Sequence, residues 1–285
     1  MSRRSGIMLC YPFEEKRLAK WPRPYIVQPK LDGTRCRAVP TEDGWKMLTS
    51  EENPIISCPH ILNELNSIPR HLWMELDGEL YTHGLTFEQI SSPVRRTTNL
   101  HEDHEQIQFH VFDMVSETLP QYSRFHLLEG FFKQTTLKHI KKVPTDVAAT
   151  IHGIMNCMEE FINEGYEGII VRNLDGLYKR KRSTDIMKFK PRKSDWYEII
   201  GYKEEVDKHG VPKNRLGALI CKGDDETEFS VGSGFTAKQR HDYWLFKESL
   251  VGYYVRVNYQ HITPGKGVPR FPIFVDLEPA SGELS

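Results

Sequence analysis

The sequence predicts an α+β protein with two regions of different character. Up to about residue 193, strand-like and helix-like segments follow one another without the regular strand–helix–strand order of a parallel sheet. From residue 194 onwards short strands predominate, and one helical segment interrupts them. We therefore expect two domains, over residues 1–193 and 194–285.

The first region is predicted to contain antiparallel sheets with flanking helices. Apolar or alternating segments predict strands at 25–29, 36–39, 45–48, 73–76, 107–112 and 167–171. Apolar residues at helical spacing predict helices at 59–68, 87–90, 124–133 and 151–162. Gly165 is the expected stop of the last helix.

The second region is predicted to be a small β-barrel. Strands are expected at 196–202, 216–221, 227–231, 255–259 and 273–277, with a helix over 237–247. Five strands and one helix in about ninety residues are typical of an OB-fold.

The most informative segment runs from Gln28 to Arg35 and reads Gln-Pro-Lys-Leu-Asp-Gly-Thr-Arg. It places Lys30 at the end of a buried strand, where desolvation and neighbouring cations activate a lysine as a nucleophile. Arg35 can bind phosphate or ribose oxygens, and Gly33 lets the backbone come close to a ligand. The same residues also describe an ordinary surface turn, so this segment alone does not decide between the two interpretations.

Later segments supply what a nucleotide-binding lysine site needs. A carboxylate is expected on a tight turn at 77–80, an aromatic face on the strand at 109–113, and a second carboxylate at 167–172. The alternation at 187–190 predicts that Lys188 and Lys190 project from one face of a strand. The ordered set favours covalent chemistry on a nucleotide phosphate far more than any one segment does.

With these segments in order, the chain resembles the covalent nucleotidyltransferase superfamily, and within it the ATP-dependent DNA ligases. The segments match that family's motifs I, III, IIIa, IV and V, and Pro269-Arg270-Phe271-Pro272 matches motif VI. Residues 229–235 and 269–274 are similar to the C-terminal signature of the minimal two-domain ligases of the Chlorella virus type. The resemblance covers nearly the whole chain.

The resemblance implies ATP as the nucleotide, a covalent AMP adduct on Lys30, and Mg²⁺, with Mn²⁺ as an alternative. It implies catalytic roles for Lys30, Asp32, Lys188, Lys190 and Arg270. The implied nucleotide-binding residues are Gln28, Lys30, Arg35, Glu79, Phe112, Glu167, Arg172, Lys188 and Lys190. Glu79 and Glu167 are the implied metal carboxylates, Phe112 the ring that stacks on adenine, and Gln28 the reader of the adenine edge. Arg270 would meet the β and γ phosphates when the second domain closes on a hinge at 191–195.

The expected macromolecular partner is nicked double-stranded DNA, bound by a monomer. Net charge is −1, yet residues 179–193 hold eight basic residues and one acid, so the cations are concentrated there. The expected DNA-binding residues are Arg95, Arg96, Lys179, Arg180, Lys181, Arg182, Arg192, Lys193, Ser233 and Phe235.

The chain departs from the family pattern in two places. After motif I it has Thr49-Ser50-Glu51-Glu52 where these ligases carry a Ser-Arg pair, so we expect Arg95 or Arg96 to substitute, or nick binding to be weak. Only residues 203–217 separate the first two strands of the second domain, which leaves no room for a full latch hairpin. Without a latch or an additional N-terminal DNA-binding domain, we do not expect the chain to encircle DNA.

Composition limits the class of protein without identifying it. The five cysteines show no Cys-x-x-Cys pair, which favours free thiols in a reducing cytoplasm over a disulfide frame or a zinc site. No apolar run reaches membrane-spanning length, so no membrane partner is expected, and a viral or phage protein acting in a host cell fits equally. The alternatives are an RNA ligase, a capping-type nucleotidyltransferase, and an inactive nucleic-acid-binding relative.

Overall fold

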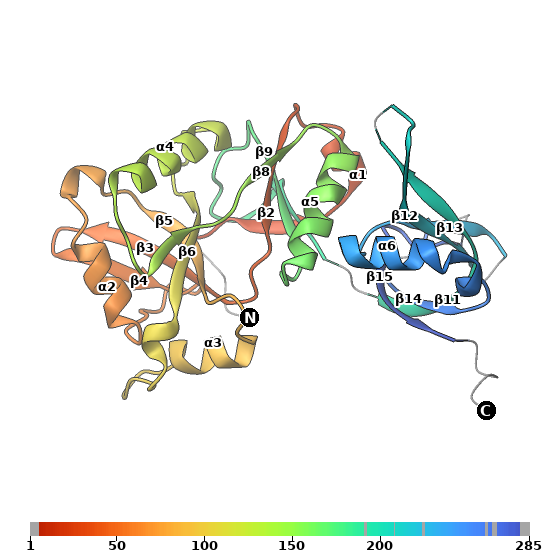
Figure 1. Ribbon diagram of the computed structural model, residues 1–285. Helices are drawn as coiled ribbons and strands as arrows, with labels where there is room; N and C mark the ends of the chain where they lie inside the picture. The colour runs from red at the N-terminus through yellow and green to blue at the C-terminus, as the bar shows by residue number, and fades with distance from the viewer. Residues whose placement is uncertain are drawn as a thin grey trace. The chain divides into compact units, whose positions relative to one another are not determined.

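The computed structural model describes residues 6–190, 193–207, 209–223, 226–259, 262–263 and 267–279. The chain divides into two compact units, one of Met1–Cys157 with Gly165–Phe189 and the other of Met158–Glu164 with Lys190–Ser285. Figure 1 shows their helices and strands, and the predicted α+β class is confirmed. The boundary falls close to the expected one, except that the end of a helix is assigned to the second unit.

The first unit contains two five-stranded sheets. One has the strand order β1 (Leu9–Pro12), β10 (Arg182–Phe189), β9 (Ile169–Asn173), β2 (Tyr25–Pro29) and β8 (Asp146–Ala148). The other has the order β4 (Gly44–Leu48), β3 (Thr34–Thr41), β5 (Leu76–Tyr81), β6 (Gln108–Met114) and β7 (Ile140–Lys142). The pairing is antiparallel, as predicted, except that β1 pairs with β10 and β6 pairs with β7 in parallel.

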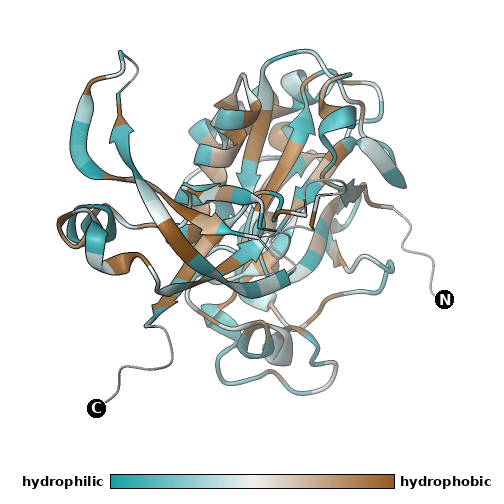
Figure 2. Ribbon diagram, turned by 90° about the vertical axis from the view of Figure 1, so that its right-hand side faces the viewer, coloured by the Kyte–Doolittle hydropathy of each residue, from teal (hydrophilic) through white to brown (hydrophobic). Residues whose placement is uncertain are grey.

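The first unit also contains helices. They are α1 (Glu15–Leu18), α2 (Pro59–Asn66), α3 (Phe87–Val94) and α4 (Gln121–Gln134), with 3₁₀ turns η1 (Arg70–Leu72) and η2 (His104–Gln106) and, across the division between the units, α5 (Ile151–Asn163). Helices α2, α3 and α4 pack against the second of these sheets. Helix α2 begins with a proline and packs Ile61 and Leu65 into the core. Figure 2 shows the apolar residues gathered on the strands, which places the core between sheets and helices.

The segment 77–80 lies inside β5 and does not form the turn that the sequence indicated. Its polar residues suggested a loop, but Asp77 is fully buried against partners that are distant in the sequence. Gly78 leaves the space that the Phe109 ring fills, since an added Cβ would lie 2.7 Å from it. Trp73, predicted as a strand residue, instead follows the turn η1, where its indole nitrogen donates to the Ile68 carbonyl.

The second unit is built on one five-stranded antiparallel sheet. Its strand order is β13 (Glu228–Val231), β12 (Pro212–Lys222), β11 (Lys193–Val206), β14 (Tyr254–Tyr259) and β15 (Ile273–Glu278). Helix α6 (Ala237–Leu245) and the 3₁₀ turn η3 (Lys247–Leu250) lie between β13 and β14. Within the described residues the two edges of the sheet meet at a single bridge, Ser233 to Ile273, so the barrel is nearly open, as OB-folds often are.

Residues 203–217, which were expected to connect the first two strands of the second domain, instead form most of a long hairpin. Strands β11 and β12 pair from Ile199 with Cys221 out to Val206 with Pro212. Its outer part was not predicted because both faces there are largely exposed, so no apolar alternation marks the strands. Figure 1 shows the hairpin projecting from the rest of its unit.

The hinge expected at 191–195 lies partly outside the described residues, and its last part, from Lys193, belongs to β11. None of the described helices is both long and apolar enough to cross a membrane.

Candidate active site

Lys30 follows a fully buried strand in the interior of a sheet. All five residues of β2 are buried, and the strand pairs with β8 and β9 on its two sides. The Lys30 amide extends the pairing by donating to the Gly168 carbonyl at 2.8 Å. This contact brings the Lys30 ammonium onto the Glu167 carboxylate, and the two side chains form a direct ion pair. The sequence predicted both residues, and the sheet register explains why they meet.

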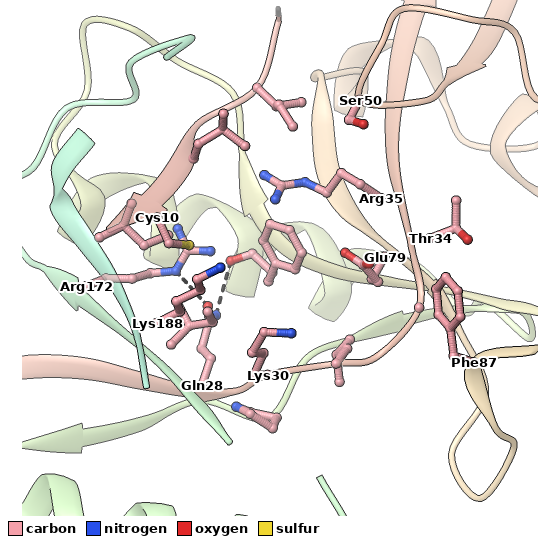
Figure 3. A pocket seen from close by; sticks show the side chains of 18 of the residues that line it. Cys10, Gln28, Lys30, Thr34, Arg35, Ser50, Glu79, Phe87, Arg172 and Lys188 are labelled. Carbon is pink, nitrogen blue, oxygen red and sulfur yellow. Dashed lines mark hydrogen bonds between the residues drawn. The ribbon is translucent and has the colours of Figure 1, made fainter. Parts of the chain in front are cut away.

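A cavity of about 440 Å³ opens beside Lys30. Figure 3 shows side chains from both sheets of the first unit pointing into it. Of the residues expected to bind nucleotide, Gln28, Lys30, Arg35, Glu79, Phe112, Arg172 and Lys188 line the cavity. Two residues expected to bind DNA, Arg95 and Arg182, line it as well.

Glu79 is the acidic member of the cavity wall. It projects from β5 and, because it is removed from water, its pKa is raised to about 7. The positive charges of Arg35 and Lys30 act in the opposite direction without cancelling the effect of burial. Near neutral pH this carboxyl group is therefore half protonated, and a cation entering the cavity would ionise it.

Arg35 is held rigidly from behind. Its guanidinium makes two hydrogen bonds to the buried Asp77 carboxylate, at 2.7 and 2.6 Å, and Asp77 raises the pKa of Arg35 above its ordinary value despite burial. The Tyr178 hydroxyl donates to the same carboxylate at 2.6 Å and accepts from the Met8 amide. The guanidinium therefore has one position, at the cavity wall.

The Phe112 ring lies close to two guanidinium groups. The Arg35 carbon atom Cζ is 4.6 Å from the ring centroid and that of Arg172 is 5.2 Å away. These contacts orient the ring at the cavity wall, and the resemblance implies that this ring stacks on adenine. Its stacking role stays a prediction.

Gln28 uses both ends of its amide within the protein. Its oxygen accepts from Arg172 Nε at 2.7 Å, and its nitrogen donates to the Phe112 carbonyl and to Thr145 Oγ1, each at 3.1 Å. The side chain is 3% exposed, so any contact with a base is restricted to the edge that faces the cavity.

The other residues expected to be catalytic lie outside the cavity wall. Asp32 is exposed in the turn between β2 and β3. Lys190 lies one residue beyond the end of β10, and of the two lysines only Lys188 is among the described residues that line the cavity. Arg270 belongs to the second unit, where its guanidinium packs over the Phe271 ring at 4.2 Å.

The basic stretch contains less available charge than the sequence suggested. Lys179 is paired with Asp185 at 2.6 Å, while Arg180 binds Glu75 at 2.8 Å and Glu117 at 2.7 Å. Asp185 is the one acid of the stretch itself, whereas Glu75 and Glu117 lie far away in the sequence, so a local count of charges overestimated the positive surface.

The other residues expected to bind DNA differ in their exposure. Phe235 is 2% exposed and stacks on Phe274 at 4.3 Å, so the expectation that its ring contacts DNA is wrong. Ser233 forms the bridge to β15, and Lys193 begins β11 on an exposed face. Arg96 and Lys181 are exposed, as the expectation requires, and Arg192 lies outside the described residues.

Sequence reasoning missed several residues of the cavity wall. Cys10 reaches it from β1, and burial raises the pKa of its thiol. Ser50 and Phe87 line the cavity together with Arg95, which lies at the end of α3. Ser50 belongs to the segment that lacks the family's arginine, and Arg95 lines the same cavity, which is consistent with the substitution expected from the sequence.

The carboxylates present fit a magnesium ion held jointly with a nucleotide. In the described part of the chain, no three His, Cys, Asp or Glu side chains converge on a common point. Magnesium commonly takes one or two carboxylates and completes its shell with phosphate and water oxygens. Glu79 and Glu167, both beside Lys30, supply hard oxygen donors of that kind.

Comparisons with known proteins agree with this geometry. Residues 7–190 match the family model of the ATP dependent DNA ligase domain. The chain belongs to the ATP-dependent DNA ligase family. Residues 209–277 match a second model, the DNA ligase OB-like domain, which confirms the predicted OB-fold.

The similar proteins include DNA ligases of a virus and of a bacterium. The chain is 29% identical over 266 residues to a DNA ligase of African swine fever virus, covering 86% of this chain and 61% of the viral protein. It is 26% identical over 275 residues to a DNA ligase of Haemophilus influenzae, covering 95% of this chain and 91% of that protein. The chain thus spans less than two thirds of the viral relatives and nearly all of the bacterial one.

Solved structures confirm the fold. The Chlorella virus DNA ligase-adenylate is similar with a TM-score of 0.63 and 24% identity, over 97% of this chain and 99% of that one. The ATP-dependent DNA ligase of bacteriophage T7 is similar with a TM-score of 0.66 and 16% identity, over 97% and 99%.

Proposed function

We propose that this chain is an ATP-dependent DNA ligase that joins a 3′-hydroxyl to a 5′-phosphate at a nick in duplex DNA. The observation that carries the proposal is Lys30, held at the end of a buried strand against Glu167, in a cavity with Arg35, Arg172 and Lys188 on its wall. A lysine that faces several cations and one carboxylate is suited to attack a phosphate. Family membership supplies the substrate class.

In the proposed first step, the Lys30 amine attacks the α-phosphorus of ATP. A nitrogen–phosphorus bond forms, the bond from that phosphorus to pyrophosphate breaks, and Glu167 is placed to accept the Lys30 proton. Arg35 and Lys188 neutralise charge on the phosphates. A magnesium ion bound to the carboxylates and the triphosphate would supply further charge neutralisation.

In the later steps, AMP passes from Lys30 to the 5′-phosphate of the nick, and the 3′-hydroxyl then displaces it. Arg95 and Arg182, at the cavity wall, and Lys181, exposed beside Arg182, are proposed contacts of the DNA phosphates.

The proposal is tested with Lys30→Ala. Incubation with α-labelled ATP and Mg²⁺, followed by a denaturing gel, should give a labelled band for the wild type and none for the variant. Lys133→Ala, which changes an exposed lysine at the end of α4, should keep the band. Retention of label by Lys30→Ala would contradict the assignment, because the adduct would then lie on another residue.

A further inference from the structure

A buried polar network lies beneath Phe112. Its members are 0–4% exposed and come from four elements: Gln28 of β2, Asp113 of β6, Gln121 and Arg124 of α4, and Arg172 of β9. Gln28 and Arg172 line the cavity, whereas the other three are not part of its wall. Groups buried in this way are costly unless each has a partner, so the network has a specific arrangement.

Asp113 fixes the position of Arg172. Its carboxylate binds Arg124 through Nε at 2.9 Å and Nη2 at 3.1 Å, and it binds Arg172 Nη1 at 3.0 Å. Arg124 cannot move away, because its Nη1 donates to the carbonyls of Leu119 and Gly176 at 2.7 and 3.0 Å. One carboxylate therefore holds two buried guanidinium groups in place.

The network also fixes which way the Gln28 amide faces. Arg172 Nε can only donate, so the atom beside it at 2.7 Å must be the amide oxygen. The Phe112 carbonyl can only accept, so the atom beside it must be the amide nitrogen. Thr145 gives its one hydroxyl proton to the Val143 carbonyl at 3.0 Å, and so it too accepts from the Gln28 nitrogen. Three independent contacts agree on one orientation.

This orientation makes Gln28 an acceptor toward the cavity. Its oxygen has a second lone pair, and its two amide protons are committed to Phe112 and Thr145. Adenine carries an amino group at position 6, which donates, where guanine carries an oxygen, which accepts. The Gln28 oxygen, held in this orientation, can accept a hydrogen bond from the adenine amino group. With guanine, two oxygens that only accept would face each other.

We propose that Asp113, Arg124 and Thr145 are positioning residues for nucleotide selection, which favour ATP over GTP by locking the orientation of the Gln28 amide. This inference rests on the proposed function, in that the base must lie at the Gln28 end of the cavity. None of the three residues needs to touch the nucleotide.

The test compares the two nucleotides in self-adenylation and self-guanylation. We measure kcat and KM with labelled ATP and GTP for Thr145→Val, Thr145→Ser and the wild type. Thr145→Val removes one hydrogen bond to the Gln28 nitrogen, so the ratio of the two kcat/KM values should fall roughly fivefold in favour of GTP. Thr145→Ser keeps the hydroxyl and should keep the wild-type ratio. Thr135→Val is the matched control, since it removes a threonine hydroxyl that bonds the Phe131 carbonyl, away from this network.

A second variant, Asp113→Asn, removes the charge that holds Arg172. It should lower the ratio of kcat/KM for ATP to kcat/KM for GTP at least as much as Thr145→Val does. A purely structural role would reduce both nucleotides equally and leave the ratio unchanged. If Asp113→Asn does not fold, as shown by its thermal melt, Thr145→Val decides the question alone. An unchanged ratio in folded Thr145→Val overturns the inference while the proposed function stands. Absence of label in the wild type with either nucleotide overturns both.

Discussion

At the scale of single residues, the cavity combines several positive groups with one carboxyl group that resists ionisation. Arg35 and Arg172 flank Phe112, and Lys30 and Lys188 complete the cationic wall. Glu79 keeps its proton to about pH 7 because burial disfavours its charge more than Arg35 and Lys30 favour it. The charges of the cavity thus suit an anion, and its carboxyl group suits a cation that arrives with that anion.

The pKa of Glu79 predicts how stability depends on pH. A carboxyl pKa raised on folding stabilises the folded state at pH below about 4.5, and this contribution is lost as pH rises through about 7. Glu79→Gln cannot ionise, so it should equal the wild type at pH 4 and exceed its free energy of unfolding at pH 8 by about 2 kcal/mol. Denaturant titrations at the two pH values measure the difference. Glu88→Gln, which changes an exposed glutamate of α3, is the control. If it also raises the free energy of unfolding at pH 8 but not at pH 4, the effect is a general one of charge.

At the scale of elements, α3 connects a capping motif with the cavity. Thr86 Oγ1 accepts from the Gln89 amide at 3.3 Å, and the Gln89 side chain accepts from the Thr86 amide at 2.9 Å, so the helix start is fixed. Phe87 at its beginning and Arg95 at its end both line the cavity. Displacement of this short helix would move both side chains.

Loss of the cap should therefore affect stability and nucleotide binding together. Thr86→Ala is expected to lower the free energy of unfolding by about 1 kcal/mol and to raise the KM for ATP in self-adenylation. Thr236→Ala is a matched control, because Thr236 and Gln239 form the same capping box at the start of α6 in the second unit. It should cost about the same stability and leave the KM unchanged. A raised KM in both variants would mean that the effect comes from general destabilisation.

At the scale of the whole molecule, the second unit contains Arg270, for which the family resemblance predicts a role in the first step. Arg270 lies in the segment that resembles motif VI, packed over Phe271, and burial lowers the pKa of its guanidinium. The family resemblance assigns this arginine to the β and γ phosphates of ATP, which are present only in the first step. Its role should consequently end when pyrophosphate leaves.

Arg270→Ala should lose self-adenylation while it still seals a nick that already carries 5′-AMP. A gel assay with both substrates measures the two activities separately. Arg256→Ala, which changes another arginine of the same unit that packs over Trp196, should keep both. Equal loss of both activities in Arg270→Ala would show that this arginine supports the fold or the DNA instead.

Salt should separate the DNA-dependent step from the nucleotide-dependent one. Lys179 and Arg180 are already paired within the first unit, so fewer cations of this stretch meet DNA than its sequence suggests. Each neutralised phosphate releases counterions, so nick sealing should fall steeply above about 0.15 M salt while self-adenylation changes little. Lys181→Ala should lower the slope of the logarithmic salt plot by about 1, with Lys133→Ala as the control. Sealing that resists salt would place the DNA contacts elsewhere.

Local patterns of the sequence are enough to predict the class of fold, the two-part organisation and several residues of the cavity wall. The apolar run of β2, the Lys30 segment and the strand that bears Phe112 are local patterns, and local patterns report strand position and side-chain alternation directly. The resemblance to the ligase family added the expectation that Gln28, Arg35, Glu79 and Arg172 bind nucleotide, and these four side chains line one cavity.

Which polar groups already have hydrogen-bond partners depends on the tertiary structure. Asp77 and Glu79 lie in a strand and not in a turn, because Arg35 and Tyr178 neutralise and bond Asp77 there. Phe235 is a core ring because Phe274 covers it. Gln28 and Arg172, 144 positions apart in the chain, become one hydrogen-bonded unit only when β2 pairs with β9. Burial and pairing depend on partners far along the chain, and no local pattern of residues specifies them.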